Sequence, residues 1–192
     1  SLLLKYVDHS SNAIGNGVNE TVITLKDDKY PVTVKLHYVA YGKENIIRAF
    51  SEISHEEKKP VILCKYASSM LHLNSSKYFL TEFSGDWAHE ANVTERELAF
   101  GKKVIDTKLG ARANMFVSPF FQLALDNPSQ ENAGEVLVGT IGWTGNFRFT
   151  FEVDNKNELR IISGINPYDS EYSLPAKEVF RTPDFYFTYS TQ

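Results

Sequence analysis

The stretch Phe147-Arg148-Phe149-Thr150-Phe151-Glu152-Val153 indicates most directly how this chain folds. Large apolar side chains alternate with polar ones along it, and successive side chains of a β-strand point to opposite faces of a sheet. The alternation therefore predicts a half-buried antiparallel strand whose inner face is aromatic. The preceding residues, Trp143-Thr144-Gly145-Asn146, supply a turn in this interpretation.

The same alternation recurs on both sides of this stretch. Residues 20–26 and 31–38 alternate and are separated by Asp27-Asp28-Lys29, which predicts a hairpin. No window has apolar residues at helical spacing over the length of a helix, and the best candidate, Glu95 to Leu98, is one turn. Further short β-rich runs lie at 46–53, 61–66, 77–83, 104–107, 120–125, 135–143, 159–165 and 185–189. The sequence thus predicts an all-β, antiparallel sandwich of about a dozen strands.

Size and charge exclude several classes of protein. The 192 residues and 21.8 kDa suit one β-sandwich domain over residues 1–192 and leave no room for two full enzyme domains. A hydrophobic content of 42% is enough for a buried core. Twenty Lys and Arg against 24 Asp and Glu give a net charge of −4, which repels polyphosphates. We therefore expect no nucleic-acid partner.

Cysteine content and hydropathy exclude two further classes. Cys64 is the single cysteine, so the chain closes no internal disulfide and has no zinc-finger spacing. Leu2-Leu3-Leu4 lacks the basic region that precedes the apolar part of a signal peptide, and no apolar run reaches membrane-spanning length. We expect no membrane partner and no cofactor.

The histidines are the first candidates for chemistry. Four of them recur every 17 or 18 residues, an interval close to one hairpin: His37, His55, His72 and His89. Metal binding needs converging imidazoles, and the sequence has no HxH or HExxH motif. Ordinary strand-surface histidines are the better interpretation, and we expect no metal site.

Carboxylates and serines give equally weak catalytic signals. Glycoside hydrolysis needs two carboxylates that flank one bond. The close pairs are Asp86 with Glu90, Glu131 with Glu135, and Asp169 with Glu171, and solvated or capping groups explain them best. No GxSxG motif is present to activate a serine.

The two tryptophans are candidates for sugar contacts, because an indole face stacks on the C–H face of a pyranose. Trp143 ends an apolar run, and we assign it to the core. Trp87 lies in a Gly85-Asp86-Trp87 turn with charged neighbours. For Trp87, sugar contact and core packing both stay open.

Several motifs in fixed order carry a resemblance to a known family. They include Gly85-Asp86-Trp87-Ala88-His89-Glu90, Ser118-Pro119-Phe120-Phe121 and Trp143-Thr144-Gly145-Asn146-Phe147. The others lie at 53–61, 65–68, 104–112, 131–136, 165–168 and 180–183. Together they resemble the N-terminal domain of bacterial α-galactosidases of glycoside hydrolase family 36, over nearly the whole chain.

This resemblance implies an antiparallel β-supersandwich of the galactose mutarotase-like type. In the family it precedes a (β/α)₈ catalytic barrel, and family strands also lie upstream of the position of Leu2. Two aspartates on that barrel hydrolyse the substrate with retention: one attacks the anomeric carbon while the other protonates the leaving oxygen. The resemblance therefore implies that this chain carries no catalytic residue and is a part of the N-terminal domain of a larger enzyme.

The resemblance also implies partners. These are the catalytic barrel domain of the same polypeptide, further copies in oligomeric members, and, through the parent enzyme, α-galactosides such as melibiose or raffinose. Both the bacterial cytoplasm and the periplasm fit. The turn-rich segments 85–90 and 110–114 are expected to contact sugar, the barrel or a neighbouring subunit. Their candidate residues are Asp86, Trp87, His89, Glu90, Arg112 and Asn114.

Two other functions stay open at this point. A free-standing carbohydrate-binding module would capture sugar through Trp87 and exposed tyrosines. A mutarotase-like enzyme would need a histidine and a carboxylate poised at one sugar ring.

Overall fold

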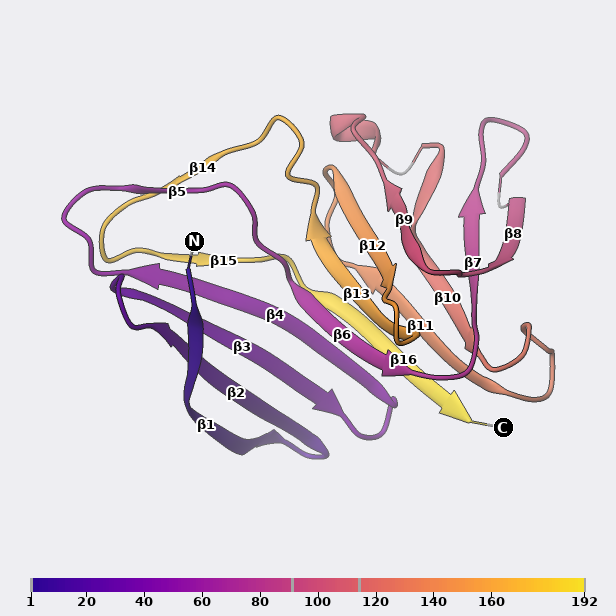
Figure 1. The fold of residues 1–192 in the computed structure, drawn as a ribbon, viewed down its shortest axis with the longest axis horizontal. Coiled ribbons are helices and arrows are strands. Elements are labelled where there is room, and N and C mark those ends of the chain that lie inside the picture. Colours follow the sequence, from indigo (N-terminus) through magenta and orange to yellow (C-terminus); the bar gives the residue numbers. More distant parts are fainter. Residues whose placement is uncertain (1, 91, 114, 192) are drawn as a thin grey trace.

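A computed structural model describes residues 2–90, 92–113 and 115–191 (Figure 1). Apart from one short 3₁₀ turn, η1 (Gly110–Arg112), the regular elements in these ranges are strands. They are β1 (Leu4–Gly15), β2 (Val18–Asp27), β3 (Val32–Tyr41), β4 (Ile46–His55), β5 (Val61–Leu63), β6 (Ser69–Asn74), β7 (Tyr78–Ser84), β8 (Asn92–Glu97), β9 (Gly101–Asp106), β10 (Val117–Leu125), β11 (Glu135–Ile141), β12 (Phe147–Val153), β13 (Glu158–Ile165), β14 (Tyr172–Leu174), β15 (Val179–Arg181) and β16 (Phe185–Thr191). No helix in the described ranges is long and apolar enough to cross a membrane.

The strands form two layers and a small arch. A ten-stranded sheet has the order β1-β2-β3-β4-β16-β11-β10-β7-β8, with β15 pairing β4. A four-stranded sheet, β6-β13-β12-β9, packs against part of it, and β5 pairs with β14 in the arch. Neighbouring strands are antiparallel in each pairing that the structure describes, such as β12 with β13 and β10 with β11. The all-β, antiparallel sandwich expected from the sequence is confirmed.

The core lies between the two sheets, and the Phe147–Val153 stretch is at its centre. Phe147, Phe149 and Phe151 are buried on the inner face of β12, as the alternation predicts. Phe121 of β10 meets Phe151 edge to face, with ring centroids 4.9 Å apart. Aromatic pairs in this geometry gain energy beyond the area that they bury. The aromatic inner face predicted from the sequence is confirmed.

The predicted hairpin around Asp27 is also confirmed. β2 and β3 pair in register from Val18 opposite Tyr41 to Lys26 opposite Thr33. Asp27 accepts hydrogen bonds from the amides of Leu3, Lys29 (2.8 Å) and Tyr30 (3.0 Å), and these bonds lower the pKa of its carboxyl. One aspartate therefore fixes the turn that ends β2.

Strands with weak alternation were missed from the sequence. The middle of β1 reads Asp8-His9-Ser10-Ser11-Asn12, and β8 is charged from Glu95 to Glu97. Both lie at edges of the large sheet, where one pairing partner suffices and little apolar surface is buried. The short strands β6, β14 and β15 were missed as well.

The strands β1 to β4 form a unit that we call the wing (Figure 1). Among the described residues, the buried core cluster draws on β7, β9 to β13, β16 and Leu98, and on none of β1 to β4. In Figure 1 the wing extends away from the four-stranded sheet, on the indigo and purple side of the ribbon. The wing is therefore largely a single layer.

Candidate functional site

The candidate residues lie on loops at one end of the sandwich, which we call the loop end. It comprises residues 85–90, 107–113 with 115–116, 142–146 and 166–171, at the top of the sandwich in Figure 1. Two of these segments cross between the sheets, one from β9 to β10 and one from β11 to β12. The loop end thus gathers chain segments that are far apart in the sequence.

A tight turn between β7 and β8 carries four candidate residues. The amide of His89 donates to the carbonyl of Asp86 at 2.9 Å, which closes the turn around Trp87 and Ala88. Asp86 Oδ1 accepts from the Trp87 amide at 2.7 Å, and Glu90 Oε1 accepts from the Ala88 amide at 3.2 Å. Both carboxylates therefore cap the turn, in agreement with the capping interpretation.

The turn points its tryptophan outward. Trp87 is 87% exposed, so core packing does not explain it. Ala88 has φ +62°, in the left-handed region that residues with a β-carbon rarely adopt. A turn that holds a bulky indole in solvent on a strained backbone suits a contact surface.

Arg112 lies on a different loop of the same end. It ends η1 and is exposed, while the neighbouring Ala113 is buried and anchors the segment. The amide of Gly85 donates to the carbonyl of Phe116 at 3.0 Å and so joins this segment to the base of the Trp87 turn. Within the described ranges, no hydrogen bond or ion pair links Arg112 to residues 86–90. Asn114 lies outside the described residues.

Two buried asparagine contacts hold the loops in place. Asn166 is 1% exposed, and its side-chain amide donates to the carbonyl of Thr107 at 2.9 Å. Its backbone amide donates to the carbonyl of Asn146 at 2.9 Å, and Asn146 Oδ1 accepts from the Gly110 amide at 2.7 Å. Three loops are thereby fixed to one another, so the loop end is a preorganised surface.

Large apolar side chains are exposed at the loop end, and sequence reasoning missed most of them. Besides Trp87 these are Tyr168 (61% exposed), Leu109 (46%), Met115 (42%), Phe116 (41%) and Trp143 (41%). They come from separate loops, so no periodic pattern in the sequence indicates them. Apolar groups gathered on one surface are typical of an interaction site.

The assignment of Trp143 to the core is wrong. β11 ends at Ile141, two residues before the tryptophan, so the side chain leaves the sheet. The indole lies against Gly145, where a β-carbon would be only 2.7 Å from Nε1. The turn glycine therefore makes room for Trp143 at the surface.

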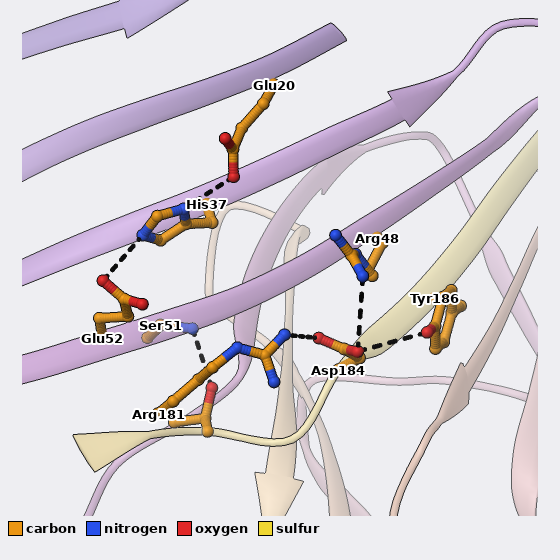
Figure 2. A network of polar contacts seen from close by, with 9 residues as sticks. Glu20, His37, Arg48, Ser51, Glu52, Arg181, Asp184 and Tyr186 are labelled. Carbon is orange, nitrogen blue, oxygen red and sulfur yellow. Dashed lines mark hydrogen bonds and ion pairs between the residues drawn. The ribbon is translucent and has the colours of Figure 1, made fainter. Parts of the chain in front are cut away.

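A second polar cluster lies on the face of the wing that points away from the core (Figure 2). His37 stands between two carboxylates, with Nδ1 3.0 Å from Glu20 Oε1 and Nε2 3.3 Å from Glu52 Oε2. Its ring stacks on Phe50 at a centroid distance of 4.4 Å. Both ring nitrogens therefore already face carboxylates, and the imidazole has no free nitrogen for acid–base catalysis on a sugar.

A group around Asp184 continues this cluster (Figure 2). Asp184 lies 2.5 Å from Arg181 Nη2 and 3.9 Å from Arg48 Nη1, and it accepts a hydrogen bond from the Tyr186 hydroxyl at 3.3 Å. Burial raises the pKa of the Tyr186 phenol, and the negative charge of Asp184 acts in the same direction. Oppositely charged groups thus neutralise one another on this face of the sheet.

His55 corrects the expectation of strand-surface histidines. It is 2% exposed, Nε2 lies 3.0 Å from the carbonyl of Leu174, and Nδ1 accepts from the Glu57 amide at 3.1 Å. A neutral ring that donates through Nε2 and accepts through Nδ1 satisfies both contacts, so the buried histidine ties β4 to the arch. No group of three or more His, Cys, Asp and Glu in the described part of the chain is placed to hold a metal ion.

Comparison with known proteins identifies the family. Residues 2–175 match the family described as "Glycosyl hydrolase family 36 N-terminal domain". The chain belongs to this family. The resemblance seen in the sequence motifs is therefore confirmed.

Relatives of this family 36 N-terminal domain are α-galactosidases. The chain is 30% identical over 188 residues to alpha-galactosidase AgaA of Geobacillus stearothermophilus, covering 97% of the chain and 25% of that protein. It is 25% identical to Mel36A of Lactobacillus acidophilus, covering 98% and 26%. The crystal structure of AgaA superposes with a TM-score of 0.90 at 27% identity, covering 100% of the chain and 28% of AgaA. The chain thus spans about a quarter of the length of these relatives.

Proposed function

We propose that this chain is a non-catalytic N-terminal β-sandwich region of an α-galactosidase that hydrolyses terminal α-galactosides such as melibiose or raffinose. The family match over residues 2–175 carries the proposal. A variant of AgaA has been solved in complex with raffinose, which supports the class of substrate. Hydrolysis belongs to two aspartates on a barrel domain of the same polypeptide, in a retaining mechanism.

The loop end is the proposed contact surface of this region. Trp87 supplies an exposed indole, the rigid and largely apolar anchor that is common at the centre of protein interfaces. Asp86, His89, Glu90 and Arg112 are exposed beside it and supply polar contacts. Asn114 is included by its position in the sequence. The partner surface is the barrel domain or a neighbouring subunit of a homo-oligomer.

Truncation of the indole tests this assignment. Trp87→Ala in the full-length enzyme is expected to weaken subunit assembly or to lower α-galactosidase activity, measured by analytical ultracentrifugation and by hydrolysis of raffinose. Tyr30→Ala is the matched control, because Tyr30 is an exposed aromatic residue in the β2–β3 turn. If the two variants behave alike, the contact role of Trp87 is lost.

The exposure of Trp87 also favours a second function, a free-standing carbohydrate-binding module. Calorimetry of the chain with galactose and with raffinose separates the two functions. Saturable heat that disappears in Trp87→Ala supports a binding module, whereas absence of heat supports a structural region of the enzyme.

A further inference from the structure

The two faces of the wing differ in chemistry. On the outer face, which points away from the core, charged side chains pair with one another, as Figure 2 shows for Glu20, His37 and Glu52. Arg48 and Arg181 likewise share Asp184. Side chains that are already paired in this way suit a face in contact with water.

The inner face of the wing continues the core side of the large sheet. Phe185 is buried in the core, and it pairs with Ala49 of β4. Register then places the same face on β2 and β3, because Ala49 pairs with Tyr38 and Tyr38 with Thr21. The inner face of β2 to β4 comprises Thr21, Ile23, Leu25, Val34, Leu36, Tyr38, Ala40, Ile47, Ala49, Ser51 and Ile53.

This inner face has no charged side chain and only partial cover. The arch packs near its upper edge, where Tyr66 meets Phe180 at a centroid distance of 4.7 Å and Phe180 pairs with Ile53. Ile23 and Leu36, which pair with each other farther from the arch, are only partly buried. A sheet with one apolar face has to bury that face against a second layer.

We propose that the inner face of the wing is the docking surface for a further segment of the same polypeptide, which presents an apolar and uncharged surface to it. The chemistry of the face favours a permanent partner, because obligate interfaces are more apolar than transient ones. The relatives supply the candidate, since about three quarters of their length lies outside the part that this chain matches. The inference rests on the proposed function and concerns a surface separate from the loop end.

Thiol labelling of neighbouring positions on β2 tests this proposal in the full-length protein. Ile23→Cys places a thiol on the inner face, and Thr24→Cys places one on the outer face of the same strand. Both positions are partly buried in the chain, so an uncovered wing would label at similar rates at the two sites. The background is Cys64→Ser, because Cys64 is exposed.

The expected result is that a maleimide reacts with Ile23→Cys at least about tenfold more slowly than with Thr24→Cys, since a covered site reacts only on local opening. Equal rates overturn the proposal. Protection that vanishes on dilution, together with dissociation of a dimer, assigns the cover to a second copy and also overturns it. If Ile23→Cys does not fold, Thr21→Cys provides the inner-face thiol.

Activity separates this inference from the proposed function. A full-length protein that hydrolyses raffinose but labels equally at both sites loses only the docking surface. A protein that protects Ile23→Cys but has no α-galactosidase activity loses only the proposed function.

Discussion

The amide of Gly110 donates a hydrogen bond to Oδ1 of Asn146 across 2.7 Å, although 36 residues separate them in the chain. This bond joins the two segments that cross between the sheets and so fixes the shape of the loop end. Because each segment also carries exposed apolar residues, loop geometry and contact surface depend on one another.

Loss of this contact is expected to loosen the loop end. Asn146→Ala removes the acceptor of the Gly110 amide and should lower the free energy of unfolding by about 1 kcal/mol. Urea denaturation measures the loss, and hydrogen exchange of the Gly110 amide locates it. Asn155→Ala, on the exposed β12–β13 turn, is the control. Equal effects of the two variants would contradict the proposed role.

Gly139 allows two aromatic rings of the core to pack against β11. A β-carbon at this position would lie 2.6 Å from the ring of Phe121 and 2.8 Å from that of Phe185. Gly139→Ala should therefore destabilise the protein by about 1–3 kcal/mol through overpacking. In Gly15→Ala the nearest contact is an ordinary 3.6 Å, so thermal unfolding should change little. A stable Gly139→Ala variant would show that the two rings can move.

Asp126 makes stability depend on acid pH. Hydrogen bonds from the hydroxyls of Ser75 and Ser76, at 2.6 and 2.7 Å, lower the pKa of its carboxyl. The stabilisation is therefore full above the ordinary carboxyl pKa of about 3.9 and is lost as the pH falls through the lower folded value.

Asp126→Asn tests this dependence. The urea midpoint of the variant should fall less steeply than that of the parent below about pH 4. Asp8→Asn, on the exposed strand β1, should leave the acid dependence parallel to the parent. Identical acid dependence in parent and Asp126→Asn would refute the role of the carboxylate.

Glu82 links the two sheets through charge. Its Oε1 lies 2.8 Å from Lys103 Nζ of β9 and 3.0 Å from Arg96 Nη2 of β8, and the side chain is 14% exposed. Glu82→Gln leaves two cations without their partner and should cost about 1–3 kcal/mol. The exposed pair of Glu97 with Lys77 is the control, since Glu97→Gln should change stability by less than about 1 kcal/mol. Denaturation at low and high salt compares the two.

Much of the fold was predictable from the order of residues along the chain. Apolar and polar side chains alternate in Phe147–Val153 and on both sides of Asp27, and the period of two fixes which side chains share a face. The motifs that contain Trp87, Phe120 and Phe147 indicated the family, which the match over residues 2–175 confirmed.

Tertiary structure decided which separate segments meet. β1 carries almost no alternation and forms only because β2 offers a paired edge, and Trp143 reaches the surface because β11 ends at Ile141. His55 is buried because the arch brings the Leu174 carbonyl to it from 119 residues away. Local periodicity specifies faces of strands, whereas contacts between loops depend on how the sheets pack. For this reason the sequence determined the sandwich and its family, and only the folded chain determined the loop end and the uncovered face of the wing.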